Sequence, residues 1–345
     1  MGPQREAGWD AGKDLISVLP RSHMEIFPYL HQIQSLVGDR NLFQYLFVGD
    51  NVVLLDTGAS YTPSEVILPL LAKLGIQPSR LTVAINTHAD ADHHGGNESL
   101  KKAAGQMLLA CGDSDRAMIE NPDRLFASRY NQWVAEHGTG LSLYPEASEW
   151  VRKMAGPAHR IDLSFRGGEL IAVDDKRSLR VLHVPGHSDG HLALYDPVNK
   201  AVFVGDALHG NYCPSTTGEP SLPPAYFAVL AYLGTLQFLE ALEIDWIYSG
   251  HWPVYNGAAA AEFLAECRRF VDKASGLVWK SLERHPEGLT LRVCIDECGP
   301  ALGNWPAGNR WLLMYPLHGH LLHLEQQGAV TRIKGQEHSL WKMAA

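Results

Sequence analysis

Cysteine is scarce in the sequence, with five residues among 345. An odd number of cysteines scattered through a long chain argues against a disulfide framework. Cys294 and Cys298 stand four positions apart, the spacing of neighbours on a helix, and could share a metal ion. Because no second Cys or His pair follows at zinc-finger spacing, we favour the interpretation that all five are reduced cysteines of the core.

Positive charge and long apolar runs are lacking as well. The formal net charge is -9, from 29 Lys and Arg against 38 Asp and Glu, which disfavours a general surface for nucleic acids or anionic membranes. No apolar segment approaches a membrane span, and the N-terminal residues MGPQREAGWDAGKDL lack the apolar stretch of a secretory signal. We therefore expect a cytoplasmic protein that acts on a small-molecule substrate, with neither nucleic acid nor membrane as a partner.

The rest of the composition is that of a folded protein. Hydrophobic residues make up 46% of the chain and charged residues 19%, as in ordinary globular domains. The length exceeds that of one typical domain, so we expect one large domain with an appendage. We place the main domain at residues 1–256, with a helical insertion at about residues 97–157, and a C-terminal helical module at residues 257–345.

The pattern along the main domain alternates between strands and helices. Residues 63–74 resemble an amphipathic helix, and residues 97–157 are mostly helical in pattern. Two strands joined by the turn at residues 49–51 precede that helix. Further apolar, β-rich runs lie at residues 81–86, 179–186, 191–196, 201–206 and 244–250. Strands in both halves with helices between them predict an α/β fold in which helices cover a central β layer.

The C-terminal module has a different character. It shows a long helix at about residues 258–284, two helical stretches around Pro316, and a helix stopped by Gly328 before a small hairpin. We interpret it as helical and winged-helix-like. A DNA-binding role is one hypothesis for such a module, but the acidic balance disfavours it. We prefer packing against the main domain or, in a homodimer, against a second subunit, through Leu312, Leu313, Leu317, Leu321, Leu322 and Leu324.

The most informative segment is Thr87-His88-Ala89-Asp90-Ala91-Asp92-His93-His94-Gly95-Gly96. In an extended loop the side chains at 88, 90 and 92 lean to one side, and His93 follows them from the turn. So many imidazoles and carboxylates at the end of a buried strand would be costly without a cation to neutralise and coordinate them. A solvated polar loop is the alternative.

Three further polar motifs each follow an apolar strand. They are Pro185-Gly186-His187-Ser188-Asp189-Gly190-His191, Gly205-Asp206-Ala207 and Ser249-Gly250-His251. This order of motifs resembles the metallo-β-lactamase superfamily, which includes glyoxalase II-like thioesterases, lactonases and flavodiiron proteins. The resemblance covers roughly residues 27–253 and implies an αββα sandwich.

The resemblance also implies a metal site. One ion would be held by His88, Asp90 and His187, and a second by Asp92, His93 and His251, with Asp206 bridging the two. Zinc is the expected metal. Asp56 matches an early Asp of the family, where a carboxylate can orient a ligand imidazole; a strand-end turn is the alternative role for it.

Asp90 departs from the family pattern, which usually has a second His there. The ligand set then carries three formal negative charges against four positive charges on two dications. We infer a less electrophilic site with a less acidic bound water, in which iron or manganese competes better with zinc. Flavodiiron proteins have a carboxylate, Glu, at that position, so a diiron oxidoreductase is the alternative function.

The leading hypothesis is a metal-dependent hydrolase. Two cations can bridge a hydroxide, polarise a carbonyl oxygen and stabilise the tetrahedral intermediate, so no Ser or Cys nucleophile is needed. We expect an ester, lactone, thioester or amide substrate, with Asp92 as the partner of the water proton. His94, His191 and His209 stand beside ligand positions and are either proton shuttles or structural histidines.

Several other residues are candidates for the substrate site. Tyr212 and Tyr255 follow metal motifs and could help to bind an oxyanion. Specificity should lie in residues 97–157 and in the proline-rich loop at 209–224. Aromatic residues that line either a pocket or the core are Tyr130, Trp133, Tyr144 and Tyr226.

Overall fold

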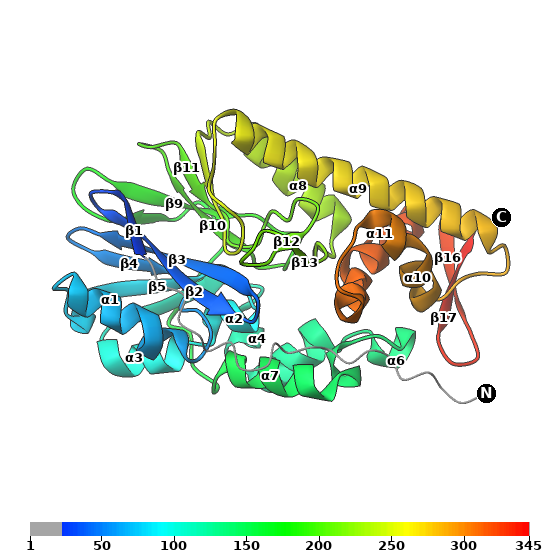
Figure 1. Ribbon diagram of the computed structural model, residues 1–345, viewed down its shortest axis with the longest axis horizontal. Helices are drawn as coiled ribbons and strands as arrows, with labels where there is room; N and C mark the ends of the chain where they lie inside the picture. Colours follow the sequence, from blue (N-terminus) through cyan, green and yellow to red (C-terminus); the bar gives the residue numbers. More distant parts are fainter. Residues whose placement is uncertain (1–22, 345) are drawn as a thin grey trace.

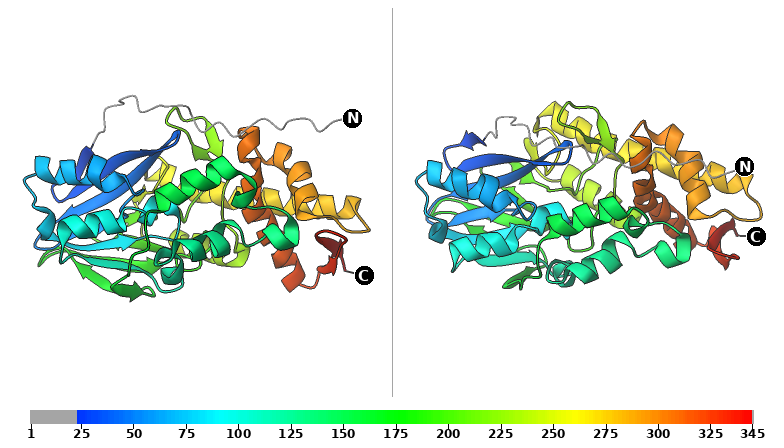
Figure 2. Two further views of the ribbon diagram at one scale, coloured as in Figure 1. Left: turned by 90° about the horizontal axis from the view of Figure 1, so that it is seen from below. Right: turned by 60° about the horizontal axis from the view of Figure 1, so that its bottom comes forward.

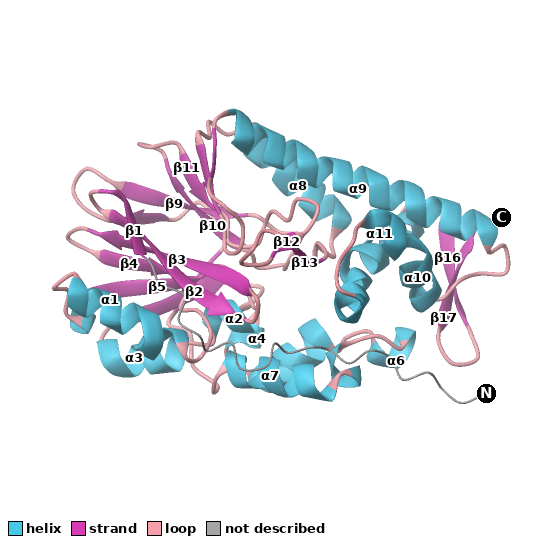
Figure 3. Cartoon of the chain, in the orientation of Figure 1, coloured by secondary structure: helices cyan, strands magenta, loops and turns pink. Residues whose placement is uncertain are grey.

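The computed structural model describes residues 23–344, and the N-terminal stretch considered above lies outside them. The described residues form two large β-sheets that lie face to face, with helices on the outer sides of both (Figures 1 and 3). The C-terminal helices lie at the opposite end of the molecule from the N-terminal strands (Figure 2). The predicted αββα sandwich with a C-terminal helical module is therefore confirmed.

The first sheet contains seven strands in chain order. Its early strands pair antiparallel, and β4, β5, β6 and β7 pair parallel. Because parallel neighbours end at the same edge, the residues that follow β4, β5 and β6 lie close together. The strands are β1 (His23–Phe27), β2 (Leu30–Val37), β3 (Arg40–Val48), β4 (Val52–Leu55), β5 (Leu81–Asn86), β6 (Leu108–Gly112) and β7 (Leu163–Phe165).

The second sheet has six strands in the order β15-β14-β11-β10-β9-β8. In it β9 and β10 form an antiparallel hairpin, and β11 runs parallel to β14. The strands are β8 (Leu170–Ala172), β9 (Ser178–His183), β10 (Leu192–Asp196), β11 (Ala201–Phe203), β14 (Trp246–Tyr248) and β15 (Tyr255–Asn256). A small separate hairpin consists of β12 (Cys213–Pro214) and β13 (Pro220–Leu222).

Apolar side chains fill the space between the sheets. The ring of Phe203 lies 5.0 Å from the rings of both Tyr45 and Phe47, edge on, and all three side chains are buried. Each such side chain contributes about 1.5–3 kcal/mol by leaving water. This apolar layer holds the two sheets against each other, so the loops at their shared edge keep fixed positions.

Helices cover the outer faces. The first sheet is covered by η1 (Pro63–Ile67), α1 (Leu68–Lys73), α3 (Asn97–Ala104) and α7 (Pro145–Ala155), and the second by α8 (Val229–Glu240) and α9 (Ala258–Arg284). Shorter helical segments are η2 (Pro78–Arg80), α2 (Ala91–His94), α4 (Arg116–Ile119), α5 (Pro122–Leu125), η3 (Phe126–Tyr130), α6 (Val134–His137) and η4 (Leu141–Leu143).

One prediction for the main domain needs correction. Residues 97–157 are mostly helical, as predicted, but strand β6 (Leu108–Gly112) lies among them and pairs with β5 and β7, so they do not form one continuous helical insertion. Its sequence, LLACG, is a short apolar run, and hydrophobic periodicity alone does not distinguish such a run from part of a buried helix. The predominantly helical part begins at α4.

The C-terminal module follows the predicted order. After α9 come α10 (Leu291–Leu302), η5 (Ala307–Leu313) and α11 (Met314–Gln326), and then the hairpin of β16 (Val330–Lys334) and β17 (Ser339–Met343). Pro316 lies in the first turn of α11, where its missing N–H is tolerated. No helix among residues 23–344 is both long and apolar enough to cross a membrane.

The module packs against the main domain of its own chain. One cluster of buried side chains runs from Val202 in the second sheet through α9 to Leu317 and Trp341. Three of the six leucines, Leu313, Leu317 and Leu321, are buried in it, and the other three pack against it. Cys294 and Cys298 are also buried there, with their Sγ atoms 4.0 Å apart. Within the described residues, both groups of side chains suited to a metal ion lie elsewhere.

His318 should make this packing sensitive to acid. It is buried against Trp133 and His137, its Nε2 has no hydrogen-bond partner among the described residues, and burial lowers its pKa to about 3. The unfolded chain takes up a proton near pH 6.5 and the folded chain does not, so stability is lost as pH falls below 6.5. When the pH falls from 7 to 5, the free energy of unfolding should decrease in both proteins. The decrease should be about 2 kcal/mol smaller for His318→Phe than for the wild type. Urea unfolding at both pH values tests this, and equal losses would contradict it.

Candidate metal centre

The candidate ligands lie in loops that end at one edge of the sandwich. The segment after β5 carries His88 in a loop and Asp92 and His93 in the short helix α2, while His187 lies in the connection between β9 and β10. Asp206 follows β11 and His251 follows β14, and these two strands are parallel neighbours. The backbone N–H of Leu192 donates to the carbonyl of Thr87 over 2.8 Å. This bond ties the second sheet to the loop that carries most of the candidate ligands.

Asp92, His93 and His251 form one compact group of possible ligands. His251 Nε2 lies 3.4 Å from His93 Nε2 and 3.3 Å from Asp92 Oδ2. An ion bonded to its ligands at roughly 2.0–2.1 Å in a tetrahedral site places those ligand atoms about 3.3 Å apart. The spacing of the group therefore fits a divalent metal ion.

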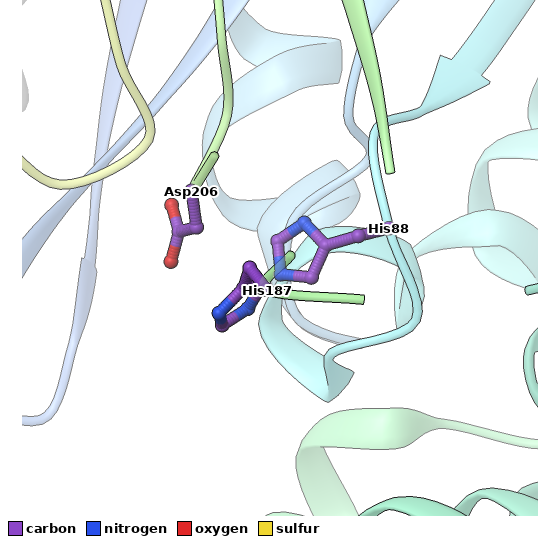
Figure 4. Close-up of side chains that lie close together, drawn as sticks. All are labelled: His88, His187 and Asp206. Atoms are coloured by element: carbon purple, nitrogen blue, oxygen red, sulfur yellow. The ribbon is translucent and has the colours of Figure 1, made fainter. Parts of the chain in front are cut away.

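His88, His187 and Asp206 form a second group, with ligand atoms that all lie within 4.8 Å of one another. Their side chains come from three separate loops and lie close together (Figure 4). His88 Nε2 and Asp206 Oδ1 are buried and have no hydrogen-bond partner among the described residues. Unpaired buried polar atoms are costly, and a shared cation would satisfy both of them.

Asp206 also borders the first of these groups. Its Oδ1 lies 3.6 Å from His93 Nε2 and its Oδ2 lies 3.4 Å from His251 Nε2. This position between the two groups suits the bridging role expected for Asp206. The assignment of individual ligands to individual ions remains a prediction.

Hydrogen bonds on the outer ring nitrogens orient three of the imidazoles. Nδ1 of His93 lies 2.8 Å from Asp56 Oδ2, and Nδ1 of His251 lies 2.6 Å from the carbonyl oxygen of Asn41. Nδ1 of His88 lies 2.9 Å from the hydroxyl of Thr87. Each bond leaves Nε2 directed toward the centre. Asp56 thus contacts the imidazole of a candidate ligand, as the sequence predicted, and it does so from a strand-end position with a positive φ of 63°.

The charges of the centre are those of a cation site. Burial acts to raise the pKa of Asp92, but His93 and His251 outweigh it and hold the pKa at about 2. The pKa of Asp206 is also well below its usual value, because His251 and His93 outweigh the effect of burial. Burial would lower the pKa of His93, yet the surrounding carboxylates hold it well above the usual value. Ionised carboxylates beside inward-facing imidazole nitrogens suit divalent metals.

Arg129, which sequence reasoning missed, forms an ion pair with Asp90. Its Nε lies 2.8 Å from Asp90 Oδ1 and its Nη2 lies 3.0 Å from Oδ2, while the Arg129 side chain is only 3% exposed. Asp90 Oδ2 also lies 2.9 Å from His187 Nε2 and 3.4 Å from His88 Nε2. Burial acts to raise the pKa of Asp90, but Arg129 and the two imidazoles hold it well below its usual value.

Asp115 is a second residue that sequence reasoning missed. It is fully buried, and its carboxylate accepts hydrogen bonds from the backbone N–H of Ala89, the hydroxyl of Ser188 and the N–H of Gly190. It therefore joins the loop after β5 to the loop that carries His187. The available signal was its position just after β6, the strand that the helical pattern concealed.

The three flanking histidines are buried around the ligands. His191 stacks on His88 at 4.5 Å and bonds through Nε2 to the carbonyl of Val204. His209 Nε2 lies 3.0 Å from His187 Nδ1. Burial lowers the pKa of His94 to about 4. His191 and His209 thus make hydrogen bonds as structural histidines do, while Nε2 of His94 has no partner among the described residues. Proton transfer by any of the three stays a prediction.

The aromatic candidates divide between the site and the core. The hydroxyl of Tyr130 donates to Asp90 Oδ1 over 3.3 Å and accepts from the N–H of Ala91. Tyr255 stacks on Phe263, and the hydroxyl of Tyr212 donates to the carbonyl of Gly218. These two tyrosines thus make their contacts away from the ligands. Trp133, Tyr144 and Tyr226 pack against Tyr315, Trp311 and Tyr232, respectively.

Comparison with known proteins links this arrangement to one family. The family model described as metallo-beta-lactamase superfamily matches residues 38–251. A solved structure of a metallo-beta-lactamase family protein from Thermus thermophilus superposes with a TM-score of 0.69 at 22% identity, covering 92% of this chain and 100% of that chain. At that identity the superposition shows a shared fold.

The curated relatives match this chain over only part of its length. The hydroxyacylglutathione hydrolase of Methylococcus capsulatus is 27% identical over 180 residues, 50% of this chain and 53% of that protein. The acyl-coenzyme A thioesterase MBLAC2 of Bos taurus is 25% identical over 265 residues, 72% of this chain and 85% of that protein. The chain thus spans about half the length of the first of these relatives.

Gly250 offers a test of the geometry. A Cβ at this position would lie 2.4 Å from Asp206 Oδ1 and 2.8 Å from the His93 ring, while the Gly250 N–H is fixed by a 2.8 Å bond to Gly205. Gly250→Ala should displace both side chains and weaken metal binding by about 10–100-fold, as displaced supporting groups do. Equilibrium titration with zinc against a chromophoric chelator measures the change.

Gly276→Ala is the matched control. Gly276 lies inside α9, and no atom of the described residues outside that helix turn comes within 4 Å of the place that a Cβ would take. Alanine should therefore leave zinc affinity unchanged and stabilise the helix by about 0.5–1 kcal/mol. Wild-type zinc affinity in Gly250→Ala would contradict the described arrangement.

Proposed function

This chain belongs to the metallo-beta-lactamase superfamily, and we propose that it is a hydrolase that uses two divalent metal ions to cleave an ester, lactone, thioester or amide. The proposal rests on one observation: two adjacent groups of imidazoles and carboxylates have Asp206 between them, and its Oδ1 and His88 Nε2 are buried without a hydrogen-bond partner among the described residues. Zinc is the proposed metal. Ligand atoms of this kind and spacing suit it.

The protein side chains have separable tasks in this proposal. Two bound cations would supply Lewis acidity, polarising the carbonyl oxygen and activating a water or hydroxide held between them. Asp92 is the proposed catalytic residue, because its carboxylate stays ionised at neutral pH and borders both His93 and His251. It can accept the proton of the attacking water. Asp56, through His93, and Asn41, through His251, keep the ligand rings in place.

Thioesters are the substrates to test first. Hydroxyacylglutathione and acyl-coenzyme A, named in two of the relatives, are both thioesters. A diiron oxidoreductase is the alternative, motivated by the carboxylate at Asp90. Protein that contains only zinc, with no gain of activity on iron loading, would contradict that alternative.

His88→Ala and Asp206→Ala test the proposed function. Each change removes a proposed ligand atom, so hydrolysis of acylglutathione and acyl-coenzyme A thioesters should fall more than about 100-fold, beyond the loss caused by changing a supporting residue. The free energy of unfolding and the metal content are measured on the same samples. His285→Ala, remote from the centre and partnered by Glu297, should keep wild-type activity. Full activity in either ligand variant, or in metal-free wild type, would contradict the proposal.

A further inference from the structure

We propose that Arg129 is a positioning residue that cancels the charge of Asp90. The net negative charge around the two metal ions is then that of two carboxylates rather than three. The inference rests on the proposed metal-dependent function. It concerns how the protein sets the charge of the centre, which neither the family match nor the relatives address.

The Arg129–Asp90 pair has the geometry of a permanent ion pair. Both carboxylate oxygens of Asp90 are engaged by the guanidinium, at 2.8 and 3.0 Å. Such two-point pairing is the strongest arrangement between these groups. A guanidinium keeps its charge at any relevant pH, so the compensation is fixed.

Two further residues, His187 and Tyr315, hold Arg129 in place. Its Nη1 donates to the carbonyl of His187, and its Nη2 lies 2.9 Å from His187 Nε2. The ring of Tyr315 lies 5.1 Å from the guanidinium carbon, and the Tyr315 hydroxyl donates to the Arg129 carbonyl over 3.1 Å. Tyr315 belongs to α11, so the C-terminal module fixes a charge at the metal centre. This contact gives the module a task beyond its own packing.

The charge balance follows directly. Asp90, Asp92 and Asp206 bring three negative charges to two dications, and Arg129 removes one of them. Without Arg129, the ionised Asp90 would attract a cation at His88 and His187 more strongly, because Coulomb interactions are large at short range in a buried site. With Arg129 but without Asp90, an unpaired buried cation would repel the metal ion. The two single changes should therefore act in opposite directions.

A double-mutant cycle tests this opposition. Zinc affinity of the more weakly bound ion is measured by chelator competition in wild type, Arg129→Met, Asp90→His and the double variant. Histidine at 90 supplies a neutral nitrogen ligand. We expect Arg129→Met to bind that ion at least about tenfold more tightly and Asp90→His at least about tenfold more weakly. The double variant should return to within about threefold of wild type.

Two controls make the result specific. Arg124→Met removes an exposed arginine from the same cavity of about 210 Å³ that Arg129 lines, and zinc affinity should not change. If Arg129→Met does not fold, as judged by circular dichroism, Arg129→Gln replaces it in the cycle. A merely structural role predicts that both single changes weaken binding and that the double variant is worse.

The outcomes separate this inference from the function on which it rests. Wild-type protein that binds no divalent ion would refute the proposed function itself. Wild-type protein that binds two ions, together with single variants that shift affinity in the same direction or not at all, would refute only the role of Arg129.

Discussion

Buried negative charge at the edge of the two sheets is the constraint on which the structure of the centre depends. Asp56, Asp92 and Asp206 lie around the same imidazoles, and Asp90 lies beside them with Arg129 as its partner. An unpaired buried carboxylate costs several kcal/mol. One guanidinium does not balance four carboxylates, so the arrangement calls for further positive charge. Divalent cations supply it at the point where the unpaired ligand atoms meet.

The fold makes this concentration of charge possible. Parallel pairing of β4 with β5 and of β11 with β14 brings the ends of separate strands to one edge, and the apolar layer between the sheets fixes their distance. Hydrogen bonds then join the loops. Phe43 donates its N–H to the carbonyl of Gly250 over 2.7 Å, and Asp115 links the loops of Ala89 and Ser188. Ligands far apart in sequence are thereby held on rigid supports.

Elements that depend on neighbouring residues could be predicted from the sequence. The turn at residues 49–51, the strand ending before Thr87 and the helix of residues 258–284 follow from apolar periodicity and turn residues, and the structure confirms them. The seven candidate ligands follow from polar motifs placed after strands, and their roles as ligands stay predictions. Asp56 could be predicted for the same reason, since it directly follows β4.

What the sequence did not reveal depends on contacts between distant residues. Arg129 meets Asp90 across 39 positions, and Asp115 meets Ser188 across 73; neither residue belongs to a motif. The charge count made from the sequence alone therefore left out the guanidinium beside Asp90. Strand β6 was hidden for another reason, because five apolar and small residues carry no period that separates a strand from a helix.

The most direct test of a cation-dependent centre is an anomalous difference map from crystals grown with the protein as purified, without added metal, with data collected above and below the zinc absorption edge. Two peaks, one among His88, His187 and Asp206 and one among Asp92, His93 and His251, are the predicted result. A map without either peak, from protein that is fully active as a hydrolase, would contradict the account.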